Sequence, residues 1–324
     1  MKKLPHKLTQ IITGSVLAIS MLACTTTTNT VTSPKAQMNQ DCNRACLNGF
    51  VDQYLAAMIA HDPSTLPVTS DIKFTENTVR LNLGEALWQT MTGLGDFKIY
   101  LADTYSNQAG FMGVIMENGQ PKLLTLRLQI KDGKIKEVET IITRSGLGGP
   151  FPKDMDKRVA KPLWSEALKP SESIPRLDMV VAANLYFEGM EQNNGSIVPF
   201  ADDCDRTENG LQTTNNPNLM PPMVTGEDAP VDNGMGDINP NFGLMGCKEQ
   251  FDGGGVGIFQ TPIRDFWMVD HERGLVLGNF VFTIVGGTVA IPIAELFKIK
   301  NGLIHEIEAI GISDALPHGA GTGW

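Results

Sequence analysis

An internal repeat constrains the fold of this chain more than any other feature of its sequence. The segment Phe74-Thr-Glu-Asn77 returns 132 residues later as Arg206-Thr-Glu-Asn209. A second match, between residues 131–141 and 300–310, has an offset of 169. The sequence therefore predicts two copies of one fold, and the larger second offset places an insertion at residues 211–246, which are rich in Pro, Gly and Asn.

Each copy is predicted to begin with an amphipathic helix, because apolar residues follow helical spacing over 47–58 and over 179–190. Tyr54 and Tyr186 hold the same place in these two helices. Segments of alternating polarity, separated by turn residues, then predict a run of strands in each copy. The sequence thus predicts an α+β protein with a first domain, a Pro-rich linker and a second domain, at residues 41–144, 145–175 and 176–324.

The first 24 residues have the pattern of an export signal. A basic start is followed by an apolar stretch too short to span a bilayer comfortably, and the stretch ends at Ala23-Cys24. This pattern resembles a bacterial lipoprotein signal, which implies that Cys24 is lipidated and, because Thr25 follows it, that the anchor is in the outer membrane. Plain secretion is the alternative. Residues 25–40 contain almost nothing that can be buried and predict a flexible tether.

The charge of the chain argues against nucleic acid as a partner. Removal of Lys2, Lys3 and Lys7 with the signal lowers the formal net charge from -10 to -13. An acidic chain without a Lys/Arg-rich run is a poor nucleic-acid binder. The expected contact with the membrane is through the lipid anchor alone, and the sequence makes no prediction of the oligomeric state.

Four cysteines remain besides Cys24, an even number that suits an oxidising compartment and allows three disulfide pairings. We pair Cys204 with Cys247, because they bracket the insertion, which leaves Cys42 to pair with Cys46. No histidine lies at ligand spacing from either pair, and the acidic residues of the insertion lack the spacing of a calcium loop. We therefore expect neither a metal nor a cofactor.

The order of the predicted elements, ending in "DGKIKEVE" and "NGLIHEIE", resembles the nuclear transport factor 2-like superfamily, which includes SnoaL-like cyclases and ketosteroid isomerases. The segments "ADDCDRTENG" and "LPHGAGTGW" are similar to a tandem SnoaL-like family of secreted proteins of unknown function. This resemblance implies two tandem cone-shaped domains, each a curved antiparallel sheet wrapped around its N-terminal helix.

The resemblance also implies a site in the second copy. Ketosteroid isomerases use a first-helix tyrosine and a late-strand acid as an oxyanion hole, and these match Tyr186 and Glu295. The first copy has Leu126 in place of the acid. The proton-moving aspartate of those enzymes matches Asn209, whose amide cannot act as a base. Asn209 is interpreted as a ligand contact or as a structural hydrogen bond.

Three further residues complete the predicted site. If Ile307 and Ala309 face the pocket on the last strand, strand alternation turns His305 the same way, which makes His305 the replacement base. Ile307 would then line the ligand site. Arg264 either lines the mouth of the cone and binds the ligand or forms a surface ion pair.

These residues support three hypotheses of function. The first is cofactor-independent acid/base chemistry (isomerisation, elimination or hydrolysis) on a small, largely apolar molecule, with Tyr186, Glu295 and His305 as the catalytic residues. The second is non-catalytic binding of such a molecule, or interaction in the cell envelope. The third is a structural protein whose cone is filled by its own side chains, with Phe187, Phe280 and Phe297 closing it.

Overall fold

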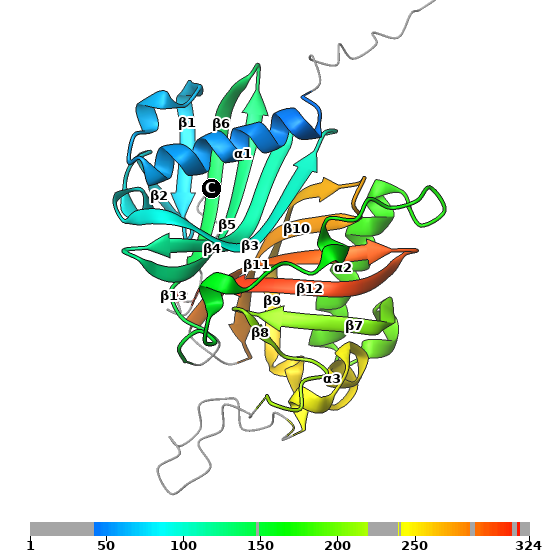
Figure 1. Ribbon diagram of the computed structural model, residues 1–324. Coiled ribbons are helices and arrows are strands. Elements are labelled where there is room, and N and C mark those ends of the chain that lie inside the picture. The colour runs from blue at the N-terminus through cyan, green and yellow to red at the C-terminus, as the bar shows by residue number, and fades with distance from the viewer. Residues whose placement is uncertain are drawn as a thin grey trace, which may run out of the picture. The chain divides into compact units, whose positions relative to one another are not determined.

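A computed structural model describes residues 42–146, 149–219, 239, 241–285, 289–312 and 316–317. These residues belong to one compact unit, Gln40–Trp324 (Figure 1). The predicted signal, Cys24, the tether and most of the predicted insertion lie outside the described residues.

The first half consists of one long helix, one mixed sheet and two short 3-10 turns. Helix α1 spans Arg44–Ile59, and the turns η1 and η2 span Pro63–Thr65 and Ala86–Gln89. The sheet has the strand order β2-β1-β6-β5-β4-β3. Its strands are β1 Val68–Glu76, β2 Val79–Leu81, β3 Met91–Asp103, β4 Gln108–Glu117, β5 Gln120–Lys131 and β6 Lys134–Thr143.

The second half repeats this plan. Helix α2 spans Arg176–Glu191, and the sheet has the order β8-β7-β12-β11-β10-β9, with β13 paired to β11. Its strands are β7 Phe200–Glu208, β8 Leu211–Gln212, β9 Phe259–Asp270, β10 Leu275–Ile284, β11 Val289–Lys300, β12 Leu303–Gly311 and β13 Leu316–Pro317. The short helical elements are η5 Gly195–Ile197, η6 Phe242–Leu244, α3 Cys247–Gly253 and η7 Val256–Ile258. The turns η3 Met155–Lys157 and η4 Pro162–Trp164 lie between the halves.

Strand pairing confirms the repeat that the sequence predicts. Phe74 of β1 pairs with Val138 of β6, and Arg206 of β7 pairs with Ile307 of β12. The two pairs are related by the offsets of 132 and 169 found in the sequence. The prediction of antiparallel sheets is wrong at this pair in each half, where the strands run parallel. A four-strand meander brings its last strand back beside the first strand in the same direction, so each sheet is mixed.

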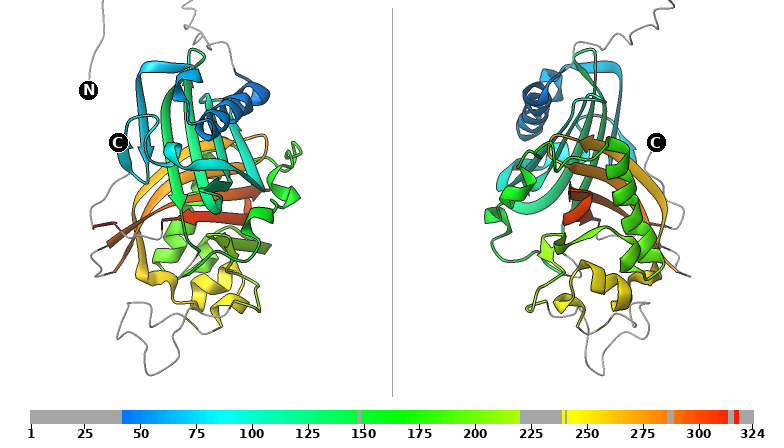
Figure 2. Two further views of the ribbon diagram at one scale, coloured as in Figure 1. Left: turned by 60° about the vertical axis from the view of Figure 1, so that its left-hand side comes forward. Right: turned by 90° about the vertical axis from the view of Figure 1, so that its right-hand side faces the viewer.

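Each long helix buries its apolar side against its own sheet. Helix α1 packs against β3 and β4, and α2 packs mainly against β9 (Figure 2). The side chain of Asn43 caps α1 by accepting a hydrogen bond from the backbone N–H of Cys46, at 3.0 Å. The buried residues of α1 follow the predicted helical spacing: Leu47, Val51, Tyr54, Leu55, Ala57 and Met58.

Two buried aspartates join the halves reciprocally. Asp103, the last residue of β3, accepts two hydrogen bonds from Arg176, the first residue of α2, and one from the backbone N–H of Val269. Asp270, the last residue of β9, accepts two from Arg44, the first residue of α1, at 2.6 and 2.7 Å. It also accepts one from the backbone N–H of Ala102, at 3.0 Å. The two copies therefore exchange equivalent contacts, as the subunits of an isologous dimer do.

An apolar layer also joins the two halves. Side chains from both halves and from the segment between them form one buried cluster, which includes Phe97, Leu101, Met155, Trp164, Trp267, Met268 and Leu277. Burial of such aromatic and aliphatic side chains stabilises by about 1.5–3 kcal/mol each. The aspartates therefore fix the register of an interface that the apolar layer holds together.

Candidate functional site

The repeated strand β7 places a buried arginine beside the predicted tyrosine of α2. Arg206 is 4 % exposed, and its Nη1 donates a hydrogen bond to the hydroxyl oxygen of Tyr186, at 3.3 Å. Its Nε lies 2.9 Å from Oε1 of Glu208 in an ion pair. A buried guanidinium is costly unless it is paired and hydrogen-bonded, and this one is both.

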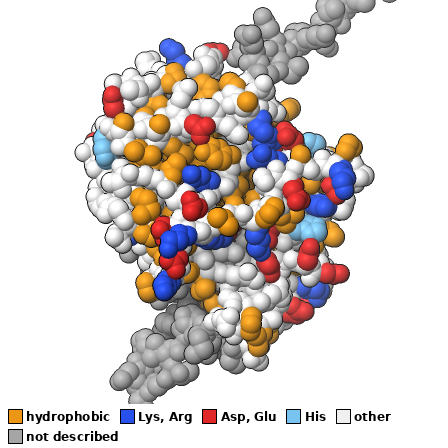
Figure 3. Space-filling view, viewed as in Figure 1, with side chains coloured by type: hydrophobic (Ala, Val, Ile, Leu, Met, Phe, Trp, Pro, Cys, Tyr) orange, Lys and Arg blue, Asp and Glu red, His pale blue; other side chains and the backbone are white. Residues whose placement is uncertain are grey.

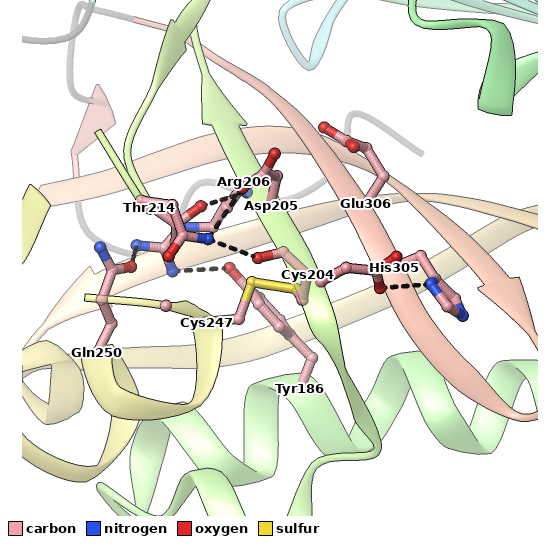
Figure 4. The surroundings of a disulfide bond; sticks show 12 residues. Tyr186, Cys204, Asp205, Arg206, Thr214, Cys247, Gln250, His305 and Glu306 are labelled. Carbon is pink, nitrogen blue, oxygen red and sulfur yellow. Dashed lines mark hydrogen bonds and ion pairs between the residues drawn. A yellow bond between two sulfur atoms is a disulfide. The ribbon is translucent and has the colours of Figure 1, made fainter. Parts of the chain in front are cut away.

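Helix α3 completes the surroundings of Arg206. Gln250 of α3 accepts a hydrogen bond from Nη2 of Arg206 at 2.6 Å and donates one to the carbonyl oxygen of Thr213. The disulfide between Cys204 and Cys247 ties the start of α3 to β7 (Figure 4). Arg206 is thus held rigidly between α2, its own strand and α3.

Glu295 of β11 is a second buried ionisable group in this cluster. It is 2 % exposed, and its sheet neighbours are Gly278 and Ala309, which are small. Burial raises the pKa of Glu295 to about 8; the charge of Glu208 adds to the rise and Arg206 opposes it. Its Oε2 is buried and has no hydrogen-bond partner among the described residues. A buried oxygen of this kind calls for a partner such as a water, an ion or a ligand.

Tyr186 is shared between the polar and apolar parts of the site. Burial raises its pKa, and the charge of Glu295 raises it further, so the hydroxyl stays protonated at neutral pH. The ring packs against Phe251 and Phe297, with centroids 5.1 and 5.2 Å away. Tyr186 therefore presents a neutral hydroxyl at the boundary between the charged cluster and the aromatic core.

The aromatic core of the second half is filled. The ring of Phe187 lies 4.2 Å from that of Phe280 and 6.0 Å from that of Phe297, and all three residues are fully buried. This packing is what the hypothesis of a side-chain-filled cone expects. A ligand would therefore meet the protein at the polar side of Tyr186 and not among these rings.

The first half has an apolar version of the same cluster. Phe74 stands at the position of Arg206 and Leu126 at the position of Glu295, and they are 1 % and 0 % exposed. The hydroxyl of Tyr54 accepts a hydrogen bond from the indole N–H of Trp88, at 3.1 Å. The second half therefore differs from the first by a buried cation and a buried acid introduced together.

The structure does not bring His305 to this cluster. Ile304 and Glu306 of β12 pair with consecutive residues of β11, so β12 has one extra residue at His305. Strand alternation breaks there, and both Ile304 and Ile307 enter the apolar core. His305 instead lies by Asp203, with its Nδ1 2.7 Å from Oδ1 of that residue (Figure 4). His305 therefore lies beside Asp203 and outside the Tyr186 cluster, and its role as a base stays a prediction.

Asn209 is engaged by the backbone in place of a ligand. Its Nδ2 donates to the carbonyl oxygen of Gly311 at 3.1 Å, and its Oδ1 accepts from the N–H of the same residue at 2.9 Å. Asn77 holds Ile142 in the same way in the first half. Both asparagines have positive φ, 49° and 46°, where asparagine is favoured over most residues. The amides therefore fasten the first strand of each sheet to the last.

The two other predicted ligand contacts also have structural partners. Arg264 forms ion pairs with Glu188 and Glu191, at 2.5 and 2.8 Å, and donates a hydrogen bond to Asn184. Of the two roles predicted for Arg264, a ligand contact or an ion pair, the structure shows the ion pair. Ile307 is fully buried in the apolar core and offers no exposed surface to a ligand.

Sequence reasoning identified Tyr186 and Glu295 but missed Arg206 and Gln250. The signal for Arg206 was present, because "FTEN" and "RTEN" differ at this position alone. A cation that replaces a buried phenylalanine in a repeat indicates a new buried partner. Gln250 gives no such signal, since it follows the segment in which the two copies differ most.

Both predicted disulfides are confirmed. Cys42 is bonded to Cys46 at the start of α1, and Cys204 is bonded to Cys247. Among the described residues, no group of three or more His, Cys, Asp or Glu side chains has the arrangement of a metal site. No described helix is long and apolar enough to cross a membrane.

A family model described as a domain of unknown function (DUF8021) matches residues 172–311, which carry this cluster. No curated protein matches the chain. Solved structures that it resembles include an NTF2-like protein of unknown function from Cytophaga hutchinsonii, at 10 % identity over 30 % of this chain and 88 % of that one, with a TM-score of 0.25.

Two further structures show the same degree of likeness. AclR from Streptomyces galilaeus is 16 % identical over 31 % of this chain and 80 % of its own, with a TM-score of 0.25. A loop-truncation variant of IdmH is 16 % identical over 30 % of this chain and 91 % of its own, with a TM-score of 0.24. Likeness at this level concerns the fold and carries no inference about substrate.

Proposed function

We propose that the second half binds a small, largely apolar molecule through one polar end group at Tyr186, Arg206 and Glu295. The observation that carries this proposal is the buried Oε2 of Glu295, which lacks a hydrogen-bond partner among the described residues. A protein rarely buries a carboxyl oxygen without a partner, because desolvation of an unpaired polar group costs about 1–3 kcal/mol. A ligand group that completes this cluster removes that cost.

The chemistry of the cluster favours a carbonyl or hydroxyl as that end group. With a pKa of about 8, Glu295 is mostly protonated at neutral pH and can donate a hydrogen bond. Arg206 adds a fixed positive charge, and the neighbouring aromatic rings favour an apolar body. A molecule with one acceptor oxygen on an apolar frame matches this combination of groups.

Acid/base catalysis is the second candidate function, and the pKa of Glu295 favours it. A carboxyl with a pKa of about 8 can both give and take a proton near neutral pH. Tyr186 and Arg206 would then stabilise a developing oxyanion. In this candidate Glu295 itself moves the proton in an isomerisation, elimination or hydrolysis, and His305 takes no part.

Replacement of Glu295 by glutamine tests the proposed function. A panel of lactones, enones and polycyclic ketones is titrated into the full chain by calorimetry. For the members that wild type binds, we expect Glu295→Gln to weaken binding about tenfold or more, which corresponds to roughly 1.4 kcal/mol. Glutamine keeps the shape of the side chain but cannot donate the acid proton in the same geometry.

Glu139→Gln is the matched control, because burial also raises the pKa of Glu139 to about 8, in the first half of the chain. We expect this variant to bind the panel as wild type does. If Glu295→Gln keeps binding but loses turnover of a panel member, the catalytic candidate is favoured. Absence of binding to wild type, or equal binding and equal turnover by Glu295→Gln, contradicts the proposed site.

We also propose how the chain divides into domains. Residues 41–144 and 176–324 would be two folding domains joined by residues 145–175, with each sheet wrapped around its N-terminal helix as a cone. The packing of α1 on β3 and β4, and of α2 on β9, supports this arrangement. The proposed ligand site then belongs to the second domain alone.

We also propose that the chain is exported and anchored in the outer membrane by a lipid on Cys24. Two disulfides support an oxidising compartment. In the native host we expect wild type to fractionate with outer membranes and Cys24→Ser to be released into the soluble fraction, as measured by immunoblot after detergent phase separation. Equal partition of the two proteins would contradict lipidation and favour plain secretion.

A further inference from the structure

The first half carries a pocket of about 380 Å³ beside its β1–β2 hairpin. The described residues that line it come from β1, from β2 and from the loop that follows β2, and α1 contributes none of them. This position differs from that of the Tyr186 cluster, which lies in the second half. The more buried lining residues are apolar and form the floor: Ile72, Phe74, Leu81 and Leu83. The exposed ones are polar and form the rim: Ser70, Arg80, Asn82 and Glu85.

The internal repeat shows what occupies the equivalent place in the second half. Cys204 stands at the position of Ile72 and is bonded to Cys247 of α3. Arg206 stands at the position of Phe74 and donates a hydrogen bond to Gln250 of α3. The second half therefore covers this edge of its sheet with its own polypeptide, which is fastened by a covalent bond and a polar contact.

Among the described residues, the first half has no counterpart of this disulfide or of this hydrogen bond. Leu81 replaces Thr213, whose carbonyl oxygen accepts a hydrogen bond from Gln250. Leu83 replaces Asn215, whose backbone N–H donates to the carbonyl oxygen of Met245. Both leucines are half-buried, so apolar surface stays open to solvent at a place where the second half has polar contacts. Figure 3 shows hydrophobic side chains reaching the surface of the first half on the face that α1 crosses.

The rim of the pocket carries one charge of each sign. Arg80 and Glu85 both line it, and the carboxylate of Glu85 accepts hydrogen bonds from the backbone and side chain of Asn82, at 2.8 and 3.0 Å. Those bonds lower the pKa of Glu85, so it is ionised at neutral pH. Opposite charges on one rim give no net preference for an anion or a cation.

We propose that this pocket binds a neutral amphipathic small molecule, with an aliphatic body on the leucine floor and a hydroxyl or carbonyl at the charged rim. Its volume falls in the range of small-molecule sites, and its lining divides evenly between apolar and polar side chains, which suits an amphipathic molecule. The site is independent of the function proposed for the second half, and nothing in the Tyr186 cluster is needed for it.

Three ligands with the same aliphatic chain test the proposal: decan-1-ol, decanoate and decylammonium. Each is titrated into the full chain by calorimetry below its micelle concentration. We expect decan-1-ol to bind, and both charged congeners to bind about tenfold more weakly, because a charged head group loses hydration on binding and the opposite charges of the rim give it no net attraction in return. Tightest binding by decanoate or decylammonium overturns the neutral class of ligand, and no binding by any of the three overturns the site.

Variants that introduce the second-half residues at equivalent positions of the first half test where decan-1-ol binds. Leu81→Thr/Leu83→Asn is expected to weaken binding of decan-1-ol at least tenfold, and Leu83→Asn alone to weaken it by a smaller factor. Leu303→Asn, at a leucine of the second half that is 40 % exposed, is the control for loss of an apolar surface residue and is expected to bind as wild type does.

Glu295→Gln, which tests the second half, should also leave binding of decan-1-ol unchanged. Equal binding by wild type and the double variant, with unchanged circular dichroism, overturns the proposed site. Binding that Glu295→Gln abolishes overturns it as well, because the alcohol would then occupy the other half.

Discussion

Replacement of Asp270 by alanine is expected to lower the free energy of unfolding by about 3–5 kcal/mol. Asp270 is fully buried and accepts hydrogen bonds from Arg44 and from the backbone N–H groups of Ala102 and Arg273. The alanine variant leaves these donors unsatisfied, and the guanidinium of Arg44 loses its buried counter-charge. Asp103→Ala should have a similar effect, because Asp103 makes the equivalent contacts in the opposite direction.

Urea unfolding followed by circular dichroism measures this loss. Glu272→Ala is the matched control, because Glu272 pairs with the same Arg44, at 2.9 Å, but its side chain is 58 % exposed. Exposed ion pairs contribute about 0–1 kcal/mol, so we expect little change in this control. Similar losses in Asp270→Ala and Glu272→Ala would mean that the buried aspartate does not hold the halves together.

The arrangement of strands was largely predictable because the sequence contains two copies of the same pattern. The two offsets in the sequence reappear as the pairing of Phe74 with Val138 and of Arg206 with Ile307. Hydrophobic periodicity also predicted α1 and α2, whose buried residues recur at helical spacing. The parallel pair in each sheet was not predicted, since pairing between the first and last strands depends on how the whole meander closes.

The site was less predictable, for two physical reasons. The bulge at His305 is one extra residue of β12 in its pairing with β11, and alternation along the sequence carries no mark of it. The partners of Arg206 come from α2, from β7 and from α3, which are far apart in the sequence. Burial of Glu295, in contrast, was predictable, because its neighbours Ala294 and Leu296 are apolar and the strand is central.

The buried carboxyls make the protein less stable as the pH rises. Burial raises the pKa of Glu295 and of Glu139 to about 8, and that of Glu306 to about 7. A carboxyl whose pKa is raised by folding binds its proton more tightly in the folded state. Its contribution to stability is therefore complete below the ordinary pKa of 4.5 and is lost as the pH rises through the folded-state value. We expect the free energy of unfolding to fall between about pH 5 and pH 8; above pH 8 the lowered pKa of Lys298, about 8, acts in the opposite direction.

Glu295→Gln should remove the share of this fall that belongs to Glu295. A shift from 4.5 to about 8 corresponds to an upper limit of about 5 kcal/mol at pH 9, where wild type must either bury the ionised carboxylate or open to solvate it. Urea unfolding at pH 5, 7 and 9 should therefore show the two proteins nearly equal at pH 5 and the variant more stable at pH 9. Parallel curves for wild type and Glu295→Gln would mean that Glu295 titrates normally in the folded protein. The cluster would then hold an ordinary carboxylate beside Arg206, and the acid proton on which both candidate functions depend would be absent.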